Sequence, residues 1–197
     1  IVVAPTFELA SQINTACKSI TKHKSALLIG GAPLKRQMEV LKEKPEIIIG
    51  TAARLVELIR LKKLKTDGIF AIVFDETDRL VKKEAVEDTS ALRDLMPGGT
   101  QIVACTATIS RQTKIFFADA KNIVMPAEDV LKKRITHWAI YAETRDKIDT
   151  LRKLLAAEKP AKALVFTSRA DQVENIYQKL AYKKVDCACI HAKTDKQ

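Results

Sequence analysis

Short runs of aliphatic residues alternate with longer amphipathic segments along the chain. Nine apolar runs, most of them bounded by polar residues, glycine or proline, predict β-strands. They lie at residues 1–4, 26–29, 46–49, 70–74, 101–105, 122–124, 136–141, 163–166 and 186–190. Between the strands, apolar residues recur at helical spacing in segments 8–20, 146–157 and 170–180. The pattern therefore predicts strands and helices in alternation.

This alternation favours an α/β fold with a parallel sheet and helices on both faces. Pro126 follows a short predicted strand, and a charged stretch separates it from the next apolar run. We therefore predict two domains, residues 1–126 and residues 127–197. The second domain is expected to run strand, helix, strand, helix, strand.

Polar segments follow several predicted strands directly. In open α/β sheets, ligands bind at the carboxyl ends of the strands, so these segments are the first place to look for chemistry. The apolar run at 70–74 ends on three carboxylates, Asp75, Glu76 and Asp78. Other such segments lie at residues 5–6, 30–31, 51–54, 106–108 and 167–169. We expect each of them on the carboxyl-end edge of its sheet.

The charge balance is basic, with a formal net charge of +10 and a pI near 9.5 over 197 residues. Clustered Lys and Arg release counterions from a phosphate backbone, so this balance favours a polyanionic partner. The densest cluster comprises Arg60, Lys62, Lys63 and Lys65. It is equally compatible with the solvated end of a helix, so charge alone does not assign a function.

No apolar run approaches the roughly 20 residues that span a bilayer. The four cysteines form no CxxC pair and have no histidines at zinc-ligand spacing, which is typical of reduced thiols. We therefore expect a cytoplasmic protein that does not engage a membrane.

Taken together, the polar segments resemble the motifs of the DEAD-box family of ATP-dependent RNA helicases, in order and in residues. The matching segments are APTFELASQ at 4–12 (motif Ia), the glycine pair at 30–31, residues 51–54 (motif Ib), DETD at 75–78 (motif II), TAT at 106–108 (motif III) and VFTSR at 165–169 (motif IV). The resemblance implies a RecA-like parallel sheet flanked by helices, followed by the first half of a second RecA-like domain. It also implies RNA-stimulated ATP hydrolysis and local unwinding of RNA duplexes.

The resemblance assigns motifs II and III to an ATP and Mg²⁺ site. Asp75 would face the Mg²⁺ shell, through water, and Glu76 would polarise the attacking water as general base. Asp78 would contact motif III, where Thr106 and Thr108 link the nucleotide to the RNA. Two alternatives stay open: Asp75 caps the following helix, or the motif III hydroxyls cap a helix beginning near Ser110.

The resemblance also implies RNA contacts to phosphates and sugars, with little sequence specificity. The implied residues are Pro5, Thr6, Gly31, Thr51 and Arg54 in the first domain, and Thr167, Ser168, Arg169 and His191 in the second. The glycine pair is also compatible with an ordinary turn, and His191 with a structural role. Phe7 replaces the family's Arg in motif Ia and removes a cationic donor, while Ala52 and Ala53 replace its Pro-Gly in motif Ib. Protein cofactors stay open.

No GxxxxGK[ST] segment occurs in the sequence. The family carries this phosphate-binding loop before motif Ia and carries motifs V and VI after motif IV. We therefore expect the chain to be part of a longer helicase and to be inactive alone. One alternative is a non-catalytic RNA-binding or scaffold member, favoured by Phe7, Ala53 and by Thr77 where the family has Ala. Another is a dinucleotide-binding Rossmann enzyme, although no GxGxxG is present.

Overall fold

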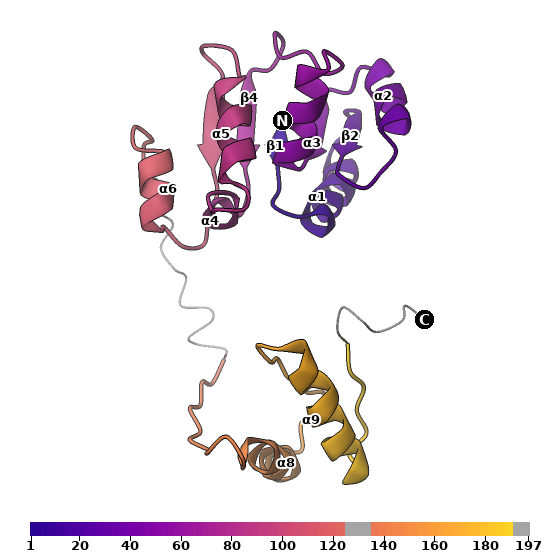
Figure 1. Ribbon diagram of the computed structural model, residues 1–197, viewed down its shortest axis with the longest axis vertical. Helices are drawn as coiled ribbons and strands as arrows, with labels where there is room; N and C mark the ends of the chain where they lie inside the picture. Colours follow the sequence, from indigo (N-terminus) through magenta and orange to yellow (C-terminus); the bar gives the residue numbers. More distant parts are fainter. Residues whose placement is uncertain (125–134, 191–197) are drawn as a thin grey trace. The chain divides into compact units, whose positions relative to one another are not determined.

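The computed structural model describes residues 1–124 and 135–190. The chain divides into two compact units, Ile1–Val124 and Met125–Gln197 (Figure 1). This division falls two residues before the predicted boundary at Pro126. The assignment of these units to two helicase domains stays a prediction.

The first unit alternates strands and helices, as the apolar pattern predicts. Its strands are β1 (Val2–Val3), β2 (Ser25–Leu28), β3 (Ile47–Gly50), β4 (Ala71–Phe74) and β5 (Gln101–Ala104). Its helices are α1 (Phe7–Ile20), α2 (Leu34–Lys42), α3 (Ala52–Arg60), α4 (Thr77–Leu80), α5 (Val86–Asp94) and α6 (Arg111–Phe116).

The five strands form one parallel sheet in the order β2-β3-β1-β4-β5. Their last residues lie level with one another, because Leu28 pairs with Gly50, Gly50 with Val3, Val3 with Phe74, and Phe74 with Ala104. The chain continues from β1 to the β2 and β3 side and crosses back to β4, so a topological switch point lies between β1 and β4. Such a point is where open α/β sheets bind ligands.

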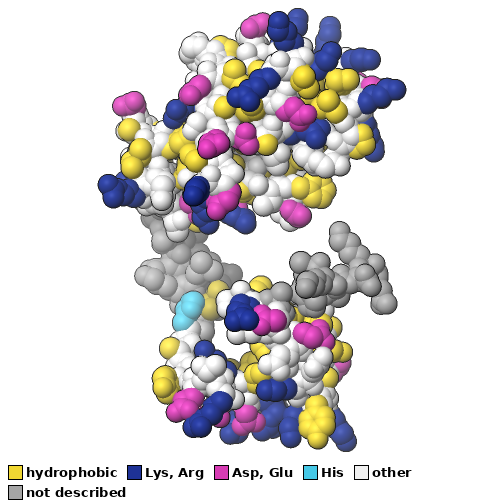
Figure 2. All heavy atoms as spheres, in the orientation of Figure 1, with side chains coloured by type: hydrophobic (Ala, Val, Ile, Leu, Met, Phe, Trp, Pro, Cys, Tyr) yellow, Lys and Arg dark blue, Asp and Glu magenta, His cyan; other side chains and the backbone are white. Residues whose placement is uncertain are grey.

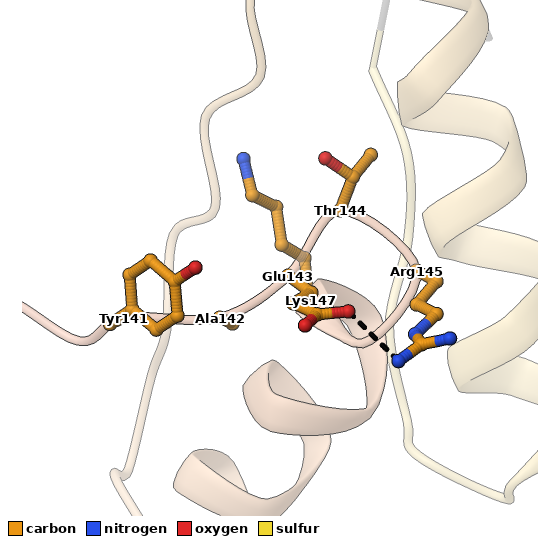
Figure 3. Close-up of a pocket in the computed structure, with 6 residues that line it drawn as sticks. All are labelled: Tyr141, Ala142, Glu143, Thr144, Arg145 and Lys147. Atoms are coloured by element: carbon orange, nitrogen blue, oxygen red, sulfur yellow. Dashed lines mark ion pairs between the residues drawn. The ribbon is translucent and has the colours of Figure 1, made fainter.

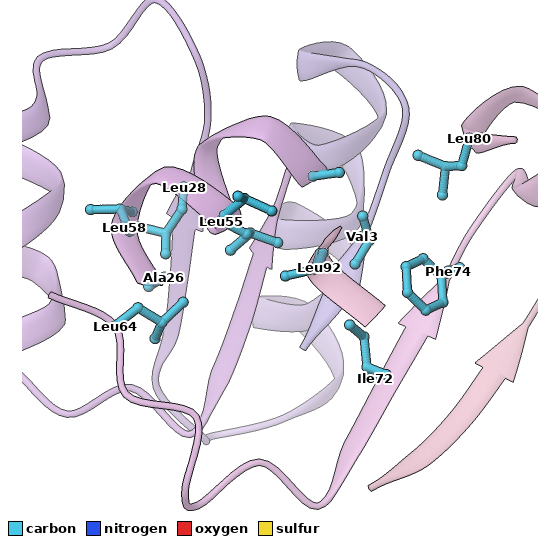
Figure 4. Packing of buried hydrophobic residues seen from close by; sticks show 12 residues of the cluster. Val3, Ala26, Leu28, Leu55, Leu58, Leu64, Ile72, Phe74, Leu80 and Leu92 are labelled. Carbon is cyan, nitrogen blue, oxygen red and sulfur yellow. The ribbon is translucent and has the colours of Figure 1, made fainter. Parts of the chain in front are cut away.

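The core lies on both faces of this sheet, because side chains alternate between the faces along each strand. On one face, Val3, Ile72 and Phe74 are fully buried and pack in one cluster with Leu55 of α3 and Leu92 of α5 (Figure 4). On the other face, a smaller cluster joins the strand-end residues Ala4, Ile29 and Ile49 to Ala10 of α1. The two clusters hold the ends of the strands in fixed positions.

The second unit contains α8 (Lys147–Glu158) and α9 (Ala170–Tyr182), which match the helices predicted at 146–157 and 170–180. The strands predicted at 136–141, 163–166 and 186–190 are wrong, and so is the strand predicted at 122–124, because these residues have no ladder partner. An apolar run becomes a strand only where a neighbouring strand supplies hydrogen bonds. In the described part of the chain, these segments belong to no helix or strand and leave side chains such as Leu164 and Phe166 more than four-fifths exposed.

No helix in residues 1–124 and 135–190 is both long enough and apolar enough to cross a membrane.

Candidate functional site

The polar segments predicted from the sequence meet at the carboxyl-end edge of the sheet. Pro5 and Thr6 follow β1, Thr51 follows β3, Asp75 and Glu76 follow β4, and Thr106 follows β5 by one residue. Figure 1 shows α4 and the start of α1 at this same edge. The level strand ends therefore bring segments from four strands into one region of the first unit.

Asp75 and Glu76 form a sharp turn at the end of β4. The backbone N–H of Asp75 donates to the carbonyl of Val3 at 2.9 Å, which continues the pairing of β4 with β1. One carboxylate oxygen of Asp75 accepts from the backbone N–H of Glu76 at 2.9 Å. Glu76 adopts a left-handed conformation, with φ of 46° and ψ of 51°. The Asp75 carboxylate thus accepts a hydrogen bond from the next residue of the turn. The alternative in which Asp75 caps α4 is wrong, because the N-cap of α4 is Glu76.

Glu76 lies at the surface, with a side chain 43% exposed. Its carboxylate pairs with Arg79, one turn along α4, at 2.9 Å. Such an exposed pair contributes about 0 to 1 kcal/mol, so it orients Glu76 only weakly. The Glu76 carboxylate therefore stays available to a molecule at this edge.

Thr77 is fully buried and bridges the ends of two strands. Its hydroxyl lies 2.9 Å from the carbonyl of Phe74 in β4 and 2.9 Å from the carbonyl of Cys105 after β5. Its backbone N–H also donates to the Cys105 carbonyl, at 3.0 Å. Thr77 is therefore more than a small replacement for Ala, because its side chain joins motif II to the residue preceding motif III.

Asp78 makes a second connection between these segments. Thr106 Oγ1 lies 3.1 Å from one oxygen of the Asp78 carboxylate, and Thr108 Oγ1 donates to the other at 3.3 Å. Thr106 Oγ1 also lies 2.8 Å from the Thr108 carbonyl, so its single proton serves one acceptor at a time. The hydroxyl that caps α6 belongs to Ser110, which accepts from the N–H of Thr113 at 3.1 Å. The alternative capping role for Thr106 and Thr108 is therefore wrong.

The segment after β1 begins α1. Thr6 is the N-cap, with its hydroxyl accepting from the backbone N–H of Leu9 at 3.2 Å. Phe7 is 51% exposed at the first helical position, where it offers an apolar face and no charge. The structure thus places Pro5 and Thr6 at the expected edge, with the Thr6 hydroxyl already in use as a cap.

The glycine pair is held by a side chain that the sequence analysis did not single out. Gln37 of α2 is 96% buried. Its Oε1 accepts from the N–H of Ile29 at 3.0 Å, and its Nε2 donates to the carbonyls of Ile29 at 2.9 Å and Ala32 at 3.2 Å. Gly31 has a φ of +77°, a conformation that favours glycine. Gln37 therefore fixes both ends of the turn.

Around β3, Gly50 is required by its neighbours. A Cβ atom on Gly50 would lie 2.2 Å from the carbonyl oxygen of Leu28. Thr51 follows at the N-cap of α3, where its hydroxyl makes no capping bond. Arg54 is bound within the protein: it donates to the Ala32 carbonyl at 3.3 Å and pairs with Glu57 at 2.9 Å, leaving its side chain 11% exposed. Arg54 thus ties α3 to the glycine turn.

Of the predicted residues in the second unit, Arg169 and Thr167 make defined contacts. Arg169 donates to both carboxylate oxygens of Asp171, at 3.0 and 2.6 Å. This hydrogen-bonded pair lowers the pKa of Asp171 and raises that of Arg169, so both stay charged. The Thr167 hydroxyl donates to the Arg169 carbonyl at 2.9 Å. Ser168 is exposed beside them, and His191 lies outside the described residues.

A hollow of about 650 Å³ lies elsewhere, along the loop that leads into α8 (Figure 3). It is lined by residues 141–145 and Lys147, all within one short segment. Arg145 pairs with Glu143 at 2.9 Å, as the dashed line in the figure marks. A hollow formed by one loop lacks the convergent groups of a binding site, so we do not assign it a ligand.

Gln37, Gly50 and the bridging role of Thr77 were missed in the sequence analysis. A signal existed for Gln37, because it interrupts the apolar stripe formed by Leu34, Met38 and Leu41 of α2. For Gly50 the signal is the distance between two strands, which a single sequence does not contain.

Two solved structures are similar to this chain in fold. Dbp5 of S. cerevisiae, bound to RNA and ADP BeF3, has a TM-score of 0.66 and 21% identity, covering 92% of this chain and 48% of that one. A DEAD box protein from the hyperthermophile Methanococcus jannaschii has a TM-score of 0.59 and 19% identity, covering 98% of this chain and 54% of that one. The RecA-like fold is confirmed for the five-stranded sheet of the first unit.

The family follows from the sequence match. A family model described as DEAD/DEAH box helicase matches residues 1–116, and the chain therefore belongs to this family. The DEAD-box ATP-dependent RNA helicase CshC of Bacillus cereus is 35% identical over 208 residues, covering 100% of this chain and 52% of the relative. The probable ATP-dependent RNA helicase YfmL of Bacillus subtilis is 33% identical, covering 100% and 54%. The chain thus spans about half the length of these curated relatives.

Replacing Thr77 by Val keeps the side-chain volume and removes the bridging hydroxyl. We expect the free energy of unfolding to fall by about 1 kcal/mol, the usual net value of a buried hydrogen bond. Urea denaturation followed by circular dichroism measures this change. Thr77→Ser, which keeps the hydroxyl, and Thr144→Val, at an exposed loop position, are the controls. Equal stability of Thr77→Val and the parent chain would contradict the bridge.

Proposed function

We propose that this chain forms part of an RNA-stimulated ATPase that opens short RNA duplexes. The observation that carries the proposal is the hydrogen-bonded contact of Asp78 with Thr106 and Thr108. It joins the acidic turn after β4 to the segment after β5. In the proposed mechanism, this contact couples the nucleotide side of the edge to the RNA side. Support also comes from CshC and YfmL, whose names describe ATP-dependent RNA helicases.

The acidic turn fits Mg²⁺ and the water that attacks ATP. Mg²⁺ prefers hard oxygen ligands, keeps several waters and is often shared with nucleotide phosphates, so one carboxylate is a sufficient protein contribution. Asp75 offers that carboxylate, through water, and the ion would neutralise charge on the phosphates. Glu76 would then accept the proton of the attacking water on a carboxylate oxygen. Its weak pairing with Arg79 is easily exchanged for that water.

The RNA side of the proposal uses the other segments of the same edge. The Thr51 hydroxyl, the Gly31 turn and the segment containing Pro5 and Thr6 are expected to contact phosphates and sugars rather than bases. Arg54 supports this surface by holding the Ala32 carbonyl. Thr167, Ser168 and Arg169 are proposed RNA contacts of the second unit, and His191 is proposed from the sequence alone.

Phosphate release by the full-length protein, with and without RNA, tests the proposal. We expect turnover to rise when RNA is added, and a duplex with a short labelled strand to release that strand only when ATP is present. Residues 1–197 measured in parallel test the expectation that this segment alone does not hydrolyse ATP. The absence of RNA stimulation in the full-length protein would overturn the proposal.

A second candidate is RNA binding without hydrolysis. It is favoured by Phe7, which is half-exposed where the family has a phosphate-binding Arg. Two measurements separate the candidates, RNA affinity and phosphate release. A binding-only protein holds RNA with the same affinity whether ATP is present or absent, and it releases no phosphate.

A further inference from the structure

The basic charge of the first unit gathers at the edge of the sheet opposite the candidate site. Three connections lead into β2, β3 and β4, at residues 20–24, 42–46 and 60–68, and we call them the amino-edge surface. Because the strands are parallel, these connections lie at the amino ends of the strands, whereas the motif residues follow the carboxyl ends. In Figure 2, Lys and Arg side chains gather along this margin of the first unit.

This surface accounts for the whole net charge of the unit. Its basic side chains number eight, against three acidic ones. The rest of Ile1–Val124 carries eleven basic and eleven acidic side chains, and therefore no net charge. The eight basic residues are Lys22, Lys24, Lys42, Lys44, Arg60, Lys62, Lys63 and Lys65. The candidate site is thus on the electrically balanced part of the unit, and the excess positive charge lies elsewhere.

These charges are accessible to a partner. All eight basic residues are exposed, and none of their side chains forms an ion pair with any residue that the structure describes. The negative ends of helix dipoles explain a cation in the last turn of a helix, such as Lys42 or Arg60. They do not explain Lys63 and Lys65, which lie beyond the end of α3, since the dipole effect falls off within one turn.

The connection after α3 is held in a defined shape. Leu64 is 95% buried in the core, between two exposed lysines. The backbone N–H groups of Lys63 and Leu64 both donate to the carbonyl of Leu58, at 2.9 and 3.1 Å. Lys62 adopts a left-handed φ of 56°, a conformation typical of the residue that follows a helix, and its N–H donates to the carbonyl of Ile59 at 2.8 Å. The lysines are therefore presented on an anchored loop.

The chemistry of this surface favours RNA over an acidic protein. Seven of the eight cations are Lys, which bind phosphate as compact point charges and need no fixed geometry of the backbone that they contact. Phe70 follows the same connection and is 83% exposed. An exposed aromatic ring provides a stacking platform for unpaired bases.

We propose that the amino-edge surface is a second, sequence-independent binding site for single-stranded RNA. It contacts phosphates through Lys62, Lys63 and Lys65 and stacks a base on Phe70. It holds RNA whether or not nucleotide is present. The site goes beyond the proposed ATPase and does not depend on it.

The test measures binding of a fluorescent oligouridylate to the full-length protein by anisotropy, without ATP, over a range of salt concentrations. The variant is Lys62→Gln, Lys63→Gln, Lys65→Gln. Its matched control is Lys147→Gln, Lys159→Gln, Lys162→Gln, which removes the same charge from exposed positions of the second unit. Thermal unfolding confirms that each variant is folded.

We expect the first variant to bind RNA about tenfold more weakly near physiological salt. The slope of log affinity against log salt should fall by about 2, since each single-strand phosphate contact contributes roughly 0.7. Phe70→Leu should weaken binding about fivefold and leave the salt slope unchanged. The second-unit control should bind as the parent protein does.

Equal affinities of the two triple variants would overturn the proposal and leave the proposed ATPase untouched. Stronger competition by polyglutamate than by unlabelled RNA would overturn it in favour of an acidic protein partner. RNA-stimulated phosphate release is measured separately, so a failure of the ATPase proposal is distinguishable from a failure of this one.

Discussion

Glu76→Gln is expected to lower RNA-stimulated ATP turnover of the full-length protein by about a hundredfold to ten-thousandfold, the range of general-base catalysis. Gln keeps the size of the side chain but its amide does not accept a proton from water. The left-handed backbone at residue 76 does not depend on the carboxylate, because the turn is held by Asp75 and by the start of α4. The loss should therefore appear in kcat, with the KM for ATP little changed, as measured by phosphate release.

Glu84→Gln is the matched control, since Glu84 is an exposed carboxylate shortly after α4. It should leave turnover unchanged. Arg79→Ala should also have a small effect, because the Arg79–Glu76 pair is exposed at both ends. Normal turnover by Glu76→Gln would exclude Glu76 as the general base and leave the role of the acidic turn to Asp75.

The sheet of the first unit was predictable because each of its strands is a short apolar run that can be recognised from its own residues. Ile49 and Phe74 lie in short apolar runs that end on a glycine or on a carboxylate. The apolar run and the residue that ends it can both be read from the sequence, without knowing which strand lies alongside. The same signal failed at residues 163–166. There the apolar run is equally clear, yet no strand lies beside it in the described part of the chain. Local periodicity predicts which residues can form a strand, whereas pairing is a property of the whole sheet.

The candidate site was predictable to a similar extent. Asp78 and Thr106 were placed together by resemblance, and the structure brings them within hydrogen-bond distance. Arg54 has a side chain that is 11% exposed and is bound to the Ala32 carbonyl and to Glu57, and its predicted contact with RNA stays a prediction. The role of Gln37 depends on a turn contributed by another element. Contacts that join two elements at the atomic level are the part that a single sequence does not specify.

Gly50→Ala is expected to lower the free energy of unfolding by about 3 kcal/mol, at the upper end of the usual cost of overpacking. The added Cβ would meet a backbone carbonyl, that of Leu28, at 2.2 Å, and no rotamer change relieves such a contact. β2 and β3 would have to separate at their last pair. The hydrogen bond from the Thr51 N–H to the same carbonyl would lengthen with them. Urea denaturation followed by circular dichroism measures the loss.

Gly68→Ala is the control that separates this steric effect from the general consequence of replacing glycine. A Cβ on Gly68 meets nothing within 4 Å, and its backbone is not in the left-handed region. The free energy of unfolding of Gly68→Ala should differ from that of the parent chain by no more than about 0.5 kcal/mol. Equal stability of the two variants would mean that β2 and β3 tolerate separation at Gly50. The level strand ends would then be less tightly fixed than the packing around Leu28 and Leu55 implies.

Because Thr51 is the next residue, a destabilised Gly50→Ala that still folds should also bind RNA more weakly in the presence of ATP.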